Sequence, residues 1–195
     1  MTTLIGWKGK DWTLLVADRR VYTEDYDREE TKIFNSDHWV YSIAGYRSVT
    51  DPVLIDEPIG KGHSGLLAVA EKLTNLADLS IKLNSDATGM AMMVEKSSRN
   101  LYMVTCDGLP WKIDTMRTAG KYQDEILFLL RRGPIADTPT LALQYIQQAV
   151  KEVVIQHATY LDFPLDYAIV RKASFLDLGG EELEWGKINE RSVDF

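Results

Sequence analysis

The order in which strand-like and helix-like segments follow one another is the feature of this sequence that most constrains its fold. Short apolar runs bounded by turn residues predict strands, and apolar residues recurring every three or four positions predict amphipathic helices. The expected order is strands within residues 2–46, a helix over about 65–83, strands over about 90–118, helices over about 122–131 and 138–160, and a last strand over 166–170.

This order differs from the strict alternation of strands and helices that builds a doubly wound parallel sheet. Two antiparallel sheets stacked face to face, with helices on both outer faces, would satisfy it. Other α+β arrangements are compatible with the pattern alone, so the pattern by itself predicts an α+β fold and no more.

Local signals refine several element boundaries. Ser64 is a favourable N-cap residue for the first long helix. Residues 51–52 (Asp-Pro) are expected to begin a short helix that stops before Pro58, because proline is tolerated in a first turn and not in a helix interior. Residues 24–30 are too polar for a core element and are expected to form an exposed loop, and residues 111–118 are expected to form one strand.

Composition limits the size and the partners of the protein. The 195 residues are 45% hydrophobic and 26% charged, which suits a single domain over residues 1–195. Within it, residues 174–195 are expected to be a C-terminal tail, either solvated or used as a strand or arm in subunit contacts. A formal net charge of −7 argues against partners that are nucleic acids or anionic membranes.

Compartment and cofactors follow from what the sequence lacks. The single cysteine, Cys106, cannot form an internal disulfide, and no signal-peptide pattern or membrane-spanning run occurs, so a cytoplasmic protein is expected. The three histidines (His38, His63 and His157) follow no metal-ligand spacing, so a metal site is not expected. GxSxG and P-loop motifs are missing from the sequence, which leaves the N-terminus as the candidate site.

Thr2 follows the initiator Met1, and a methionine before a small residue is commonly removed during synthesis. Removal would give Thr2 a free α-amine, with an ordinary pKa near 7.7–8.0, beside its own hydroxyl. One residue would then supply both the nucleophile and the base that activates it. Taken alone, a Met-Thr-Thr start is more often simply the beginning of a strand.

Four short motifs accompany Thr2 in a particular order. They are TTLIGW (2–7), VADRRV (16–21), TKIF (31–34) and SIAG (42–45). In this order and spacing they resemble the proteasome β-subunit and HslV protease family of N-terminal-nucleophile (Ntn) hydrolases. The resemblance continues through residues 118–120 (TAG) and 164–170 (PLDYAIV), and spans about residues 2–172.

The resemblance implies a four-layer αββα Ntn-hydrolase sandwich and a role for each matching residue. Thr2 resembles the nucleophile, and Lys32 the cation that keeps its hydroxyl and amine reactive. Asp18 is expected to pair with Lys32 and to hold it charged. The Gly45 N–H is expected to stabilise the oxyanion, and Asp166 resembles the late acidic residue that supports the threonine amine. Outside the resemblance, each residue also has an ordinary structural explanation in a strand end or a turn.

The resemblance implies a threonine-type peptidase that needs no metal or organic cofactor, forms a ring-like homo-oligomer and acts on peptides or proteins, with an ATPase unfoldase as a candidate partner. Two alternatives stay open: a non-catalytic ring subunit, and an Ntn amidohydrolase acting on a small amide. The sequence departs from the family pattern at Ala119, where the family carries a serine that bonds the threonine amine. The neighbouring Thr118 could replace that serine only if its hydroxyl were directed inward, and a retained Met1 would block the amine.

Overall fold

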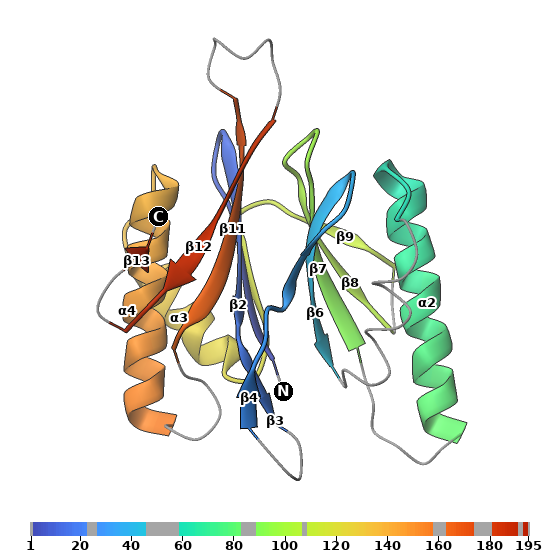
Figure 1. Ribbon diagram of the computed structural model, residues 1–195, viewed down its shortest axis with the longest axis horizontal. Helices are drawn as coiled ribbons and strands as arrows, with labels where there is room; N and C mark the ends of the chain where they lie inside the picture. Colours follow the sequence, from blue (N-terminus) through green and yellow to red (C-terminus); the bar gives the residue numbers. More distant parts are fainter. Residues whose placement is uncertain are drawn as a thin grey trace.

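Two sheets stacked face to face form the centre of the molecule (Figure 1). The computed structural model describes residues 2–22, 27–45, 59–82, 89–106, 109–157, 163–173, 181–190 and 193–194. Within this part of the chain, one sheet has six strands, each antiparallel to its neighbours. In spatial order they are β10 (Met116–Gly120), β1 (Thr3–Lys8), β2 (Trp12–Asp18), β11 (Leu165–Lys172), β12 (Glu181–Ile188) and β13 (Val193–Asp194).

The second sheet has five described strands, which are also antiparallel. In spatial order they are β5 (Ile33–Asn35), β6 (Trp39–Gly45), β7 (Gly89–Glu95), β8 (Leu101–Thr105) and β9 (Trp111–Ile113). A separate two-stranded ribbon, β3 (Arg20–Tyr22) and β4 (Asp27–Glu29), lies between β2 and β5 in the sequence.

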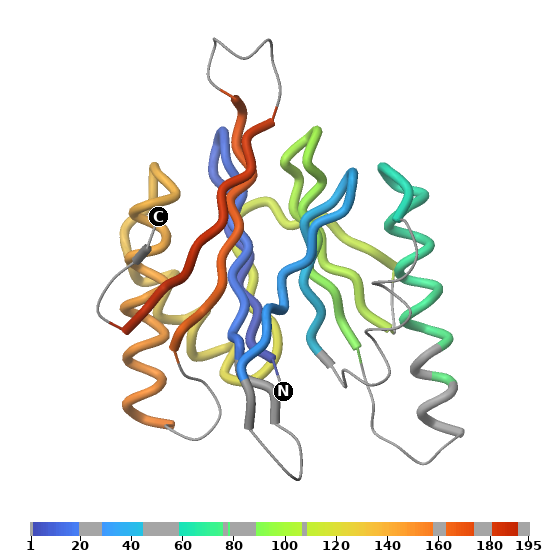
Figure 2. The backbone as a smooth tube through the Cα atoms, in the orientation of Figure 1, coloured from blue at the N-terminus to red at the C-terminus, as the bar shows by residue number. Residues whose placement is uncertain are grey.

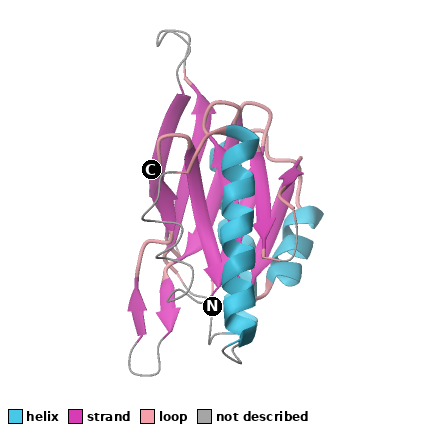
Figure 3. Ribbon diagram, turned by 90° about the vertical axis from the view of Figure 1, so that its right-hand side faces the viewer, coloured by secondary structure: helices cyan, strands magenta, loops and turns pink. Residues whose placement is uncertain are grey.

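Helices cover the outer face of each sheet. Helix α2 (Gly62–Lys82) lies along the five-stranded sheet, as the side view shows (Figure 3). Helices α3 (Gln123–Arg132) and α4 (Pro139–His157) cover the six-stranded sheet. The four-layer αββα sandwich expected from the sequence is therefore confirmed. In the described ranges, every helix is too short or too polar to cross a membrane.

Three apolar clusters correspond to the three interfaces between the four layers. The cluster between the sheets contains several small residues, among them Ala17, Ala119 and Ala168. At Gly6 a Cβ atom would come within 2.5 Å of the Met92 sulfur on the opposite sheet. Glycine at this position therefore lets the two sheets approach each other closely.

Three local predictions were wrong. Helix α2 begins at Gly62, so Ser64 lies inside its first turn, where its hydroxyl donates to the Lys61 carbonyl at 3.2 Å. Residues 111–118 contain two strands, because the chain crosses from the five-stranded sheet (β9) to the six-stranded sheet (β10) between them. Part of the expected polar loop forms β4, since backbone hydrogen bonds to β3 can hold a ribbon without an apolar face.

The remaining local predictions concern the middle and the end of the chain. The short helix expected from residues 51–52 lies outside the described residues. Residues 181–188, within the expected C-terminal tail, form β12, whose eight residues all pair with β11. This part of the tail therefore belongs to the six-stranded sheet of the same chain.

Candidate functional site

Antiparallel pairing brings the ends of four strands together at one end of the six-stranded sheet (Figure 2). Strand β1 begins at Thr3, β2 ends at Asp18, β10 ends at Gly120 and β11 begins at Leu165. Neighbouring strands run in opposite directions, so these beginnings and ends lie at the same end of the sheet. Thr2, immediately before β1, lies at this end of the sheet and is buried.

The five-stranded sheet contributes two further chain ends at the same place. Strand β5 begins at Ile33, directly after Lys32, and β6 ends at Gly45, whose backbone pairs with Gly89. The structure thus gathers all the residues singled out from the sequence at one end of the sandwich. They are Thr2, Asp18, Lys32, Gly45 and Asp166.

A buried ion pair joins the two sheets at this end. The Lys32 ammonium donates a hydrogen bond to Asp18 Oδ1, and the side chains are only 8% and 1% exposed, respectively. The Ser42 hydroxyl on β6 donates to the Lys32 carbonyl at 2.6 Å and fixes the backbone that carries the lysine. Removing two charges from water is costly, so each needs the other to remain charged here.

The same carboxylate also holds the start of β1. Asp18 Oδ2 accepts a hydrogen bond from the backbone N–H of Thr3. The Thr3 hydroxyl donates to the Lys121 carbonyl at 3.1 Å, which ties this strand to the segment that follows β10. Asp18 therefore connects the Lys32 ammonium to the peptide unit that Thr2 shares with Thr3.

Gly120 brings β10 unusually close to Thr2. Its φ of +89° lies in the left-handed region, and a Cβ atom at this position would be 1.7 Å from the Thr2 carbonyl oxygen. Only glycine fits such a conformation and such a contact without strain. Asp18 and Gly120 thus fix the backbone of Thr2 and Thr3 from two sides.

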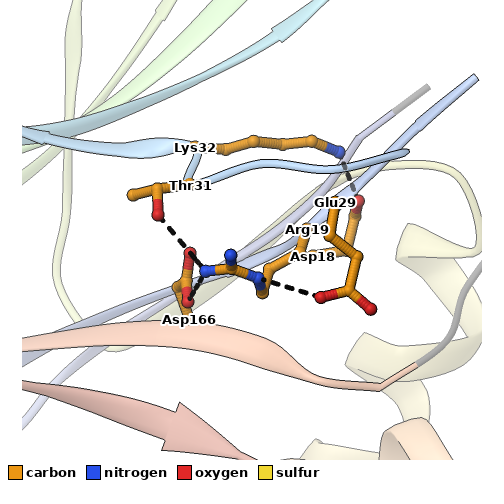
Figure 4. A network of polar contacts seen from close by, with 6 residues as sticks. All are labelled: Asp18, Arg19, Glu29, Thr31, Lys32 and Asp166. Atoms are coloured by element: carbon orange, nitrogen blue, oxygen red, sulfur yellow. Dashed lines mark hydrogen bonds and ion pairs between the residues drawn. The ribbon is translucent and has the colours of Figure 1, made fainter.

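Asp166 is held by a residue that sequence reasoning did not select. Its carboxylate accepts hydrogen bonds from Arg19 Nη1 at 2.6 Å to Oδ1 and 2.9 Å to Oδ2 (Figure 4). The same nitrogen donates to the Thr31 hydroxyl at 3.2 Å. The signal in the sequence was the arginine immediately after Asp18 in VADRRV. Support of the Thr2 amine by Asp166 stays a prediction.

The hydroxyl of Thr118 does not replace the serine that the family carries at the neighbouring position, Ala119. Ala119 is fully buried in the cluster between the sheets, opposite Leu4 on β1. The Thr118 hydroxyl donates to the Gln123 carbonyl at the start of α3, at 2.7 Å. Because successive strand residues face opposite sides, Thr118 lies on the helix-covered side of the sheet.

The described residues bring together a threonine just before a strand, a buried ammonium, and a glycine at the end of a strand in the facing sheet. The αββα layers define the class of the fold, which is an Ntn-like sandwich.

Comparison with solved structures places the fold beside Anbu proteins, one of which is described as an ancestral β-subunit. Anbu from Pseudomonas aeruginosa, described as a helical assembly, superposes with a TM-score of 0.71 at 15% identity over 97% of this chain and 88% of its own. The Gly-1 mutant of Anbu from Hyphomicrobium sp. strain MC1 gives 0.71 at 12% identity, covering 97% and 87%. Anbu from Yersinia bercovieri gives 0.69 at 12% identity, covering 87% and 82%.

These neighbours correct the family suggested by the sequence motifs. The assignment to the proteasome β-subunit and HslV-type family was wrong, because Anbu is a related but distinct family with the same fold. At 12–15% identity the likeness shows the fold alone. No family model and no curated protein matches this sequence.

Proposed function

We propose that this protein is a proteasome-like threonine peptidase in which Thr2, exposed by removal of Met1, is the nucleophile. The observation that carries the proposal is the bridge made by Asp18, which binds both the Lys32 ammonium and the Thr3 N–H. A buried cation fixed beside the first residues of a strand has a clear use if the terminal hydroxyl and amine react there. An ordinary strand start would not need one.

The proposed reaction proceeds through an acyl-enzyme. The Thr2 amine takes the hydroxyl proton, through a water molecule, as Oγ1 attacks the carbonyl carbon of the substrate amide. The Gly45 N–H stabilises the oxyanion, a role worth about 3–4 kcal/mol in related chemistry. The amide C–N bond then breaks, the leaving amine takes up the proton, and water hydrolyses the resulting ester in a second step.

The charged residues around Thr2 have supporting roles in this proposal. Lys32 favours the deprotonated forms of the neighbouring hydroxyl and amine through its positive charge. Asp18 keeps Lys32 charged and oriented. Asp166 supports the amine of Thr2, and Arg19 holds Asp166.

A second candidate, a non-catalytic subunit, is favoured by one observation. The family's serine is replaced by Ala119, and the Thr118 hydroxyl is bonded to the Gln123 carbonyl on the other side of the sheet. The amine of Thr2 then loses one hydrogen-bond partner that the family pattern provides. A third candidate, hydrolysis of a small amide, uses the same residues and differs only in substrate, because the fold does not fix the substrate.

Intact mass and hydrolysis by Thr2 variants test the proposal together. The purified protein is expected to lack one methionine residue, to cleave fluorogenic peptides and to lose this activity in Thr2→Ala. Cys106→Ala is the matched control, since it removes the only thiol and should leave hydrolysis unchanged. Retained Met1, or equal hydrolysis by wild type and Thr2→Ala, would favour the non-catalytic subunit. Cleavage of small amides without peptides would favour the third candidate.

Self-association into a ring-like homo-oligomer and a cytoplasmic location are part of the same proposal. The Anbu neighbour from Pseudomonas aeruginosa is described as a helical assembly, which supports self-association without fixing its geometry. Native mass spectrometry would give the number of subunits. An ATPase unfoldase is the proposed partner if the sites prove to be enclosed, and co-purification with ATP present would test it.

A further inference from the structure

The Arg19 side chain is the least expected part of the site, and it has little contact with solvent. Its side chain is 15% exposed and that of Asp166 is 9% exposed. All its hydrogen bonds in the described part of the chain come from Nη1, two to Asp166 and one to Thr31 (Figure 4). Glu29 lies further away, with Oε2 at 3.5 Å from Nε, and is mostly exposed. Arg19 is therefore directed mainly at Asp166.

The strand register explains why this contact matters for Thr2. Asp166 on β11 pairs with Ala17 on β2, and Ala17 pairs with Leu4 on β1, two residues after Thr2. Ala17 and Leu4 belong to the cluster between the sheets, as does Ala168, which shares a strand face with Asp166. The Asp166 carboxylate therefore lies on the face of the six-stranded sheet that packs against the other sheet. It belongs to the row of paired residues next to the end of the strands where Thr2 lies.

Arg19 also connects three segments that must keep their relative places. It follows the end of β2, contacts the beginning of β11 through Asp166, and contacts Thr31 immediately before Lys32. The Glu30 N–H donates to the Arg19 carbonyl at 2.8 Å, which closes the base of the β3–β4 ribbon. Consecutive residues 18 and 19 therefore contact the consecutive residues 32 and 31 through two separate polar contacts.

We infer that Arg19 is a positioning residue that acts through Asp166. This inference rests on the proposed function of the same site. By binding both carboxylate oxygens with one nitrogen, Arg19 fixes the orientation of Asp166 toward the end of the sheet where Thr2 lies. Among the described residues, the hydrogen bonds of the Arg19 side chain go to Asp166 and Thr31 and none goes to Thr2. Misplacement of a supporting group by about 1 Å can slow an enzyme by up to about 100-fold.

A double-mutant cycle tests whether Arg19 works through Asp166. The proteins are wild type, Arg19→Met, Asp166→Asn and the double variant, compared by kcat, by KM for a fluorogenic peptide, and by melting temperature. Arg19→Met is expected to lower kcat at least about tenfold with little change in KM. In the Asp166→Asn background the same substitution should change kcat less than about twofold, because coupled residues are not additive.

Two further variants separate positioning from general damage to the fold. Arg19→Lys keeps a cation on a similar stem and is expected to recover most of the kcat lost in Arg19→Met. Arg171→Met is the matched control, because Arg171 lies on the same strand as Asp166 and pairs with Glu182 and Glu184 at 3.0 and 2.9 Å, away from the site. It should leave kcat unchanged.

Each outcome decides one question. An equal loss of kcat from Arg19→Met in the wild-type and Asp166→Asn backgrounds would overturn the inference. If the wild type shows no Thr2-dependent hydrolysis, the proposed function fails separately, and the melting temperatures still report on the pair. Additive shifts in melting temperature would then overturn the contact between Arg19 and Asp166 on which the inference depends, and non-additive shifts would support that contact alone.

Discussion

The close approach of Gly120 to Thr2 gives the most quantitative prediction. In Gly120→Ala the new Cβ would be 1.7 Å from the Thr2 carbonyl oxygen, and such contacts essentially never occur below 3.0 Å. The two backbones would have to separate by at least 1.3 Å, the difference between these distances. The obstacle is backbone on both sides, so no side chain can move aside to relieve it.

Two costs add in this variant. An alanine in the left-handed region costs about 1–2 kcal/mol, and forcing two packed segments apart costs about 1–3 kcal/mol more. We expect Gly120→Ala to lower the free energy of unfolding by about 2–5 kcal/mol. The displaced group belongs to Thr2, so reactivity at Thr2 should fall even under conditions where the variant is fully folded.

Two other glycines in the chain separate these costs. Gly62 has a φ of +65° but its Cβ would meet nothing closer than 3.9 Å, so Gly62→Ala should show the conformational cost alone, about 1–2 kcal/mol. Gly133 has a φ of −73° and an ordinary nearest contact of 3.4 Å, so Gly133→Ala should be neutral or stabilising by up to about 1 kcal/mol.

Urea unfolding followed by tryptophan fluorescence would measure the series, since the chain has five tryptophans. The expected order of destabilisation is Gly120→Ala, then Gly62→Ala, then Gly133→Ala. If Gly120→Ala were no more destabilising than Gly62→Ala, the close contact with Thr2 would be refuted.

Three further predictions follow from named contacts. Lys32→Met leaves the Asp18 carboxylate buried without its cation, so we expect a loss of about 3–5 kcal/mol in urea unfolding together with loss of hydrolysis; an unchanged stability would contradict the buried pair. Thr118→Val removes the hydrogen bond to the Gln123 carbonyl and should cost about 1 kcal/mol while leaving kcat per folded molecule unchanged; a large drop in kcat would mean that this hydroxyl serves Thr2. The pKa of Lys8 is lowered from 10.5, first by burial and then by neighbouring cations. Between the lowered pKa and pH 10.5 the unfolded chain therefore binds more protons than the folded chain, and stability should rise with pH in this window. Lys8→Gln should reduce this rise, measured by unfolding at pH 8 and 10.

Periodic patterns predicted the long helices well because those patterns depend on local spacing alone, whereas the four layers were predicted from the family resemblance. Apolar spacing along residues 65–83 and 138–160 is visible without any knowledge of tertiary contacts, and the structure has helices there. The split within residues 111–118 was not visible, because both strands are short and the pattern does not reveal that they belong to different sheets. Ser64 was misread because Gly62, with its positive φ, already turns the chain into the helix.

The candidate site was predicted in part for a similar reason. Asp18 and Lys32 lie in short motifs with a known order, and the structure brings them into contact. The contact between Arg19 and Asp166 spans 147 residues and depends on the register of β11 against β2, which no local pattern encodes. The family was misassigned because short motifs around strand ends can follow the fold, and related families share the fold.

Mapping of a covalent adduct tests the central claim most directly. The protein is treated with an electrophilic peptide inhibitor selective for N-terminal threonines, digested, and sequenced by tandem mass spectrometry. The proposal predicts that the modified peptide begins at residue 2, with Met1 removed and the adduct on Thr2. An unmodified N-terminal peptide that still carries Met1, in a protein purified from its native host, would contradict it.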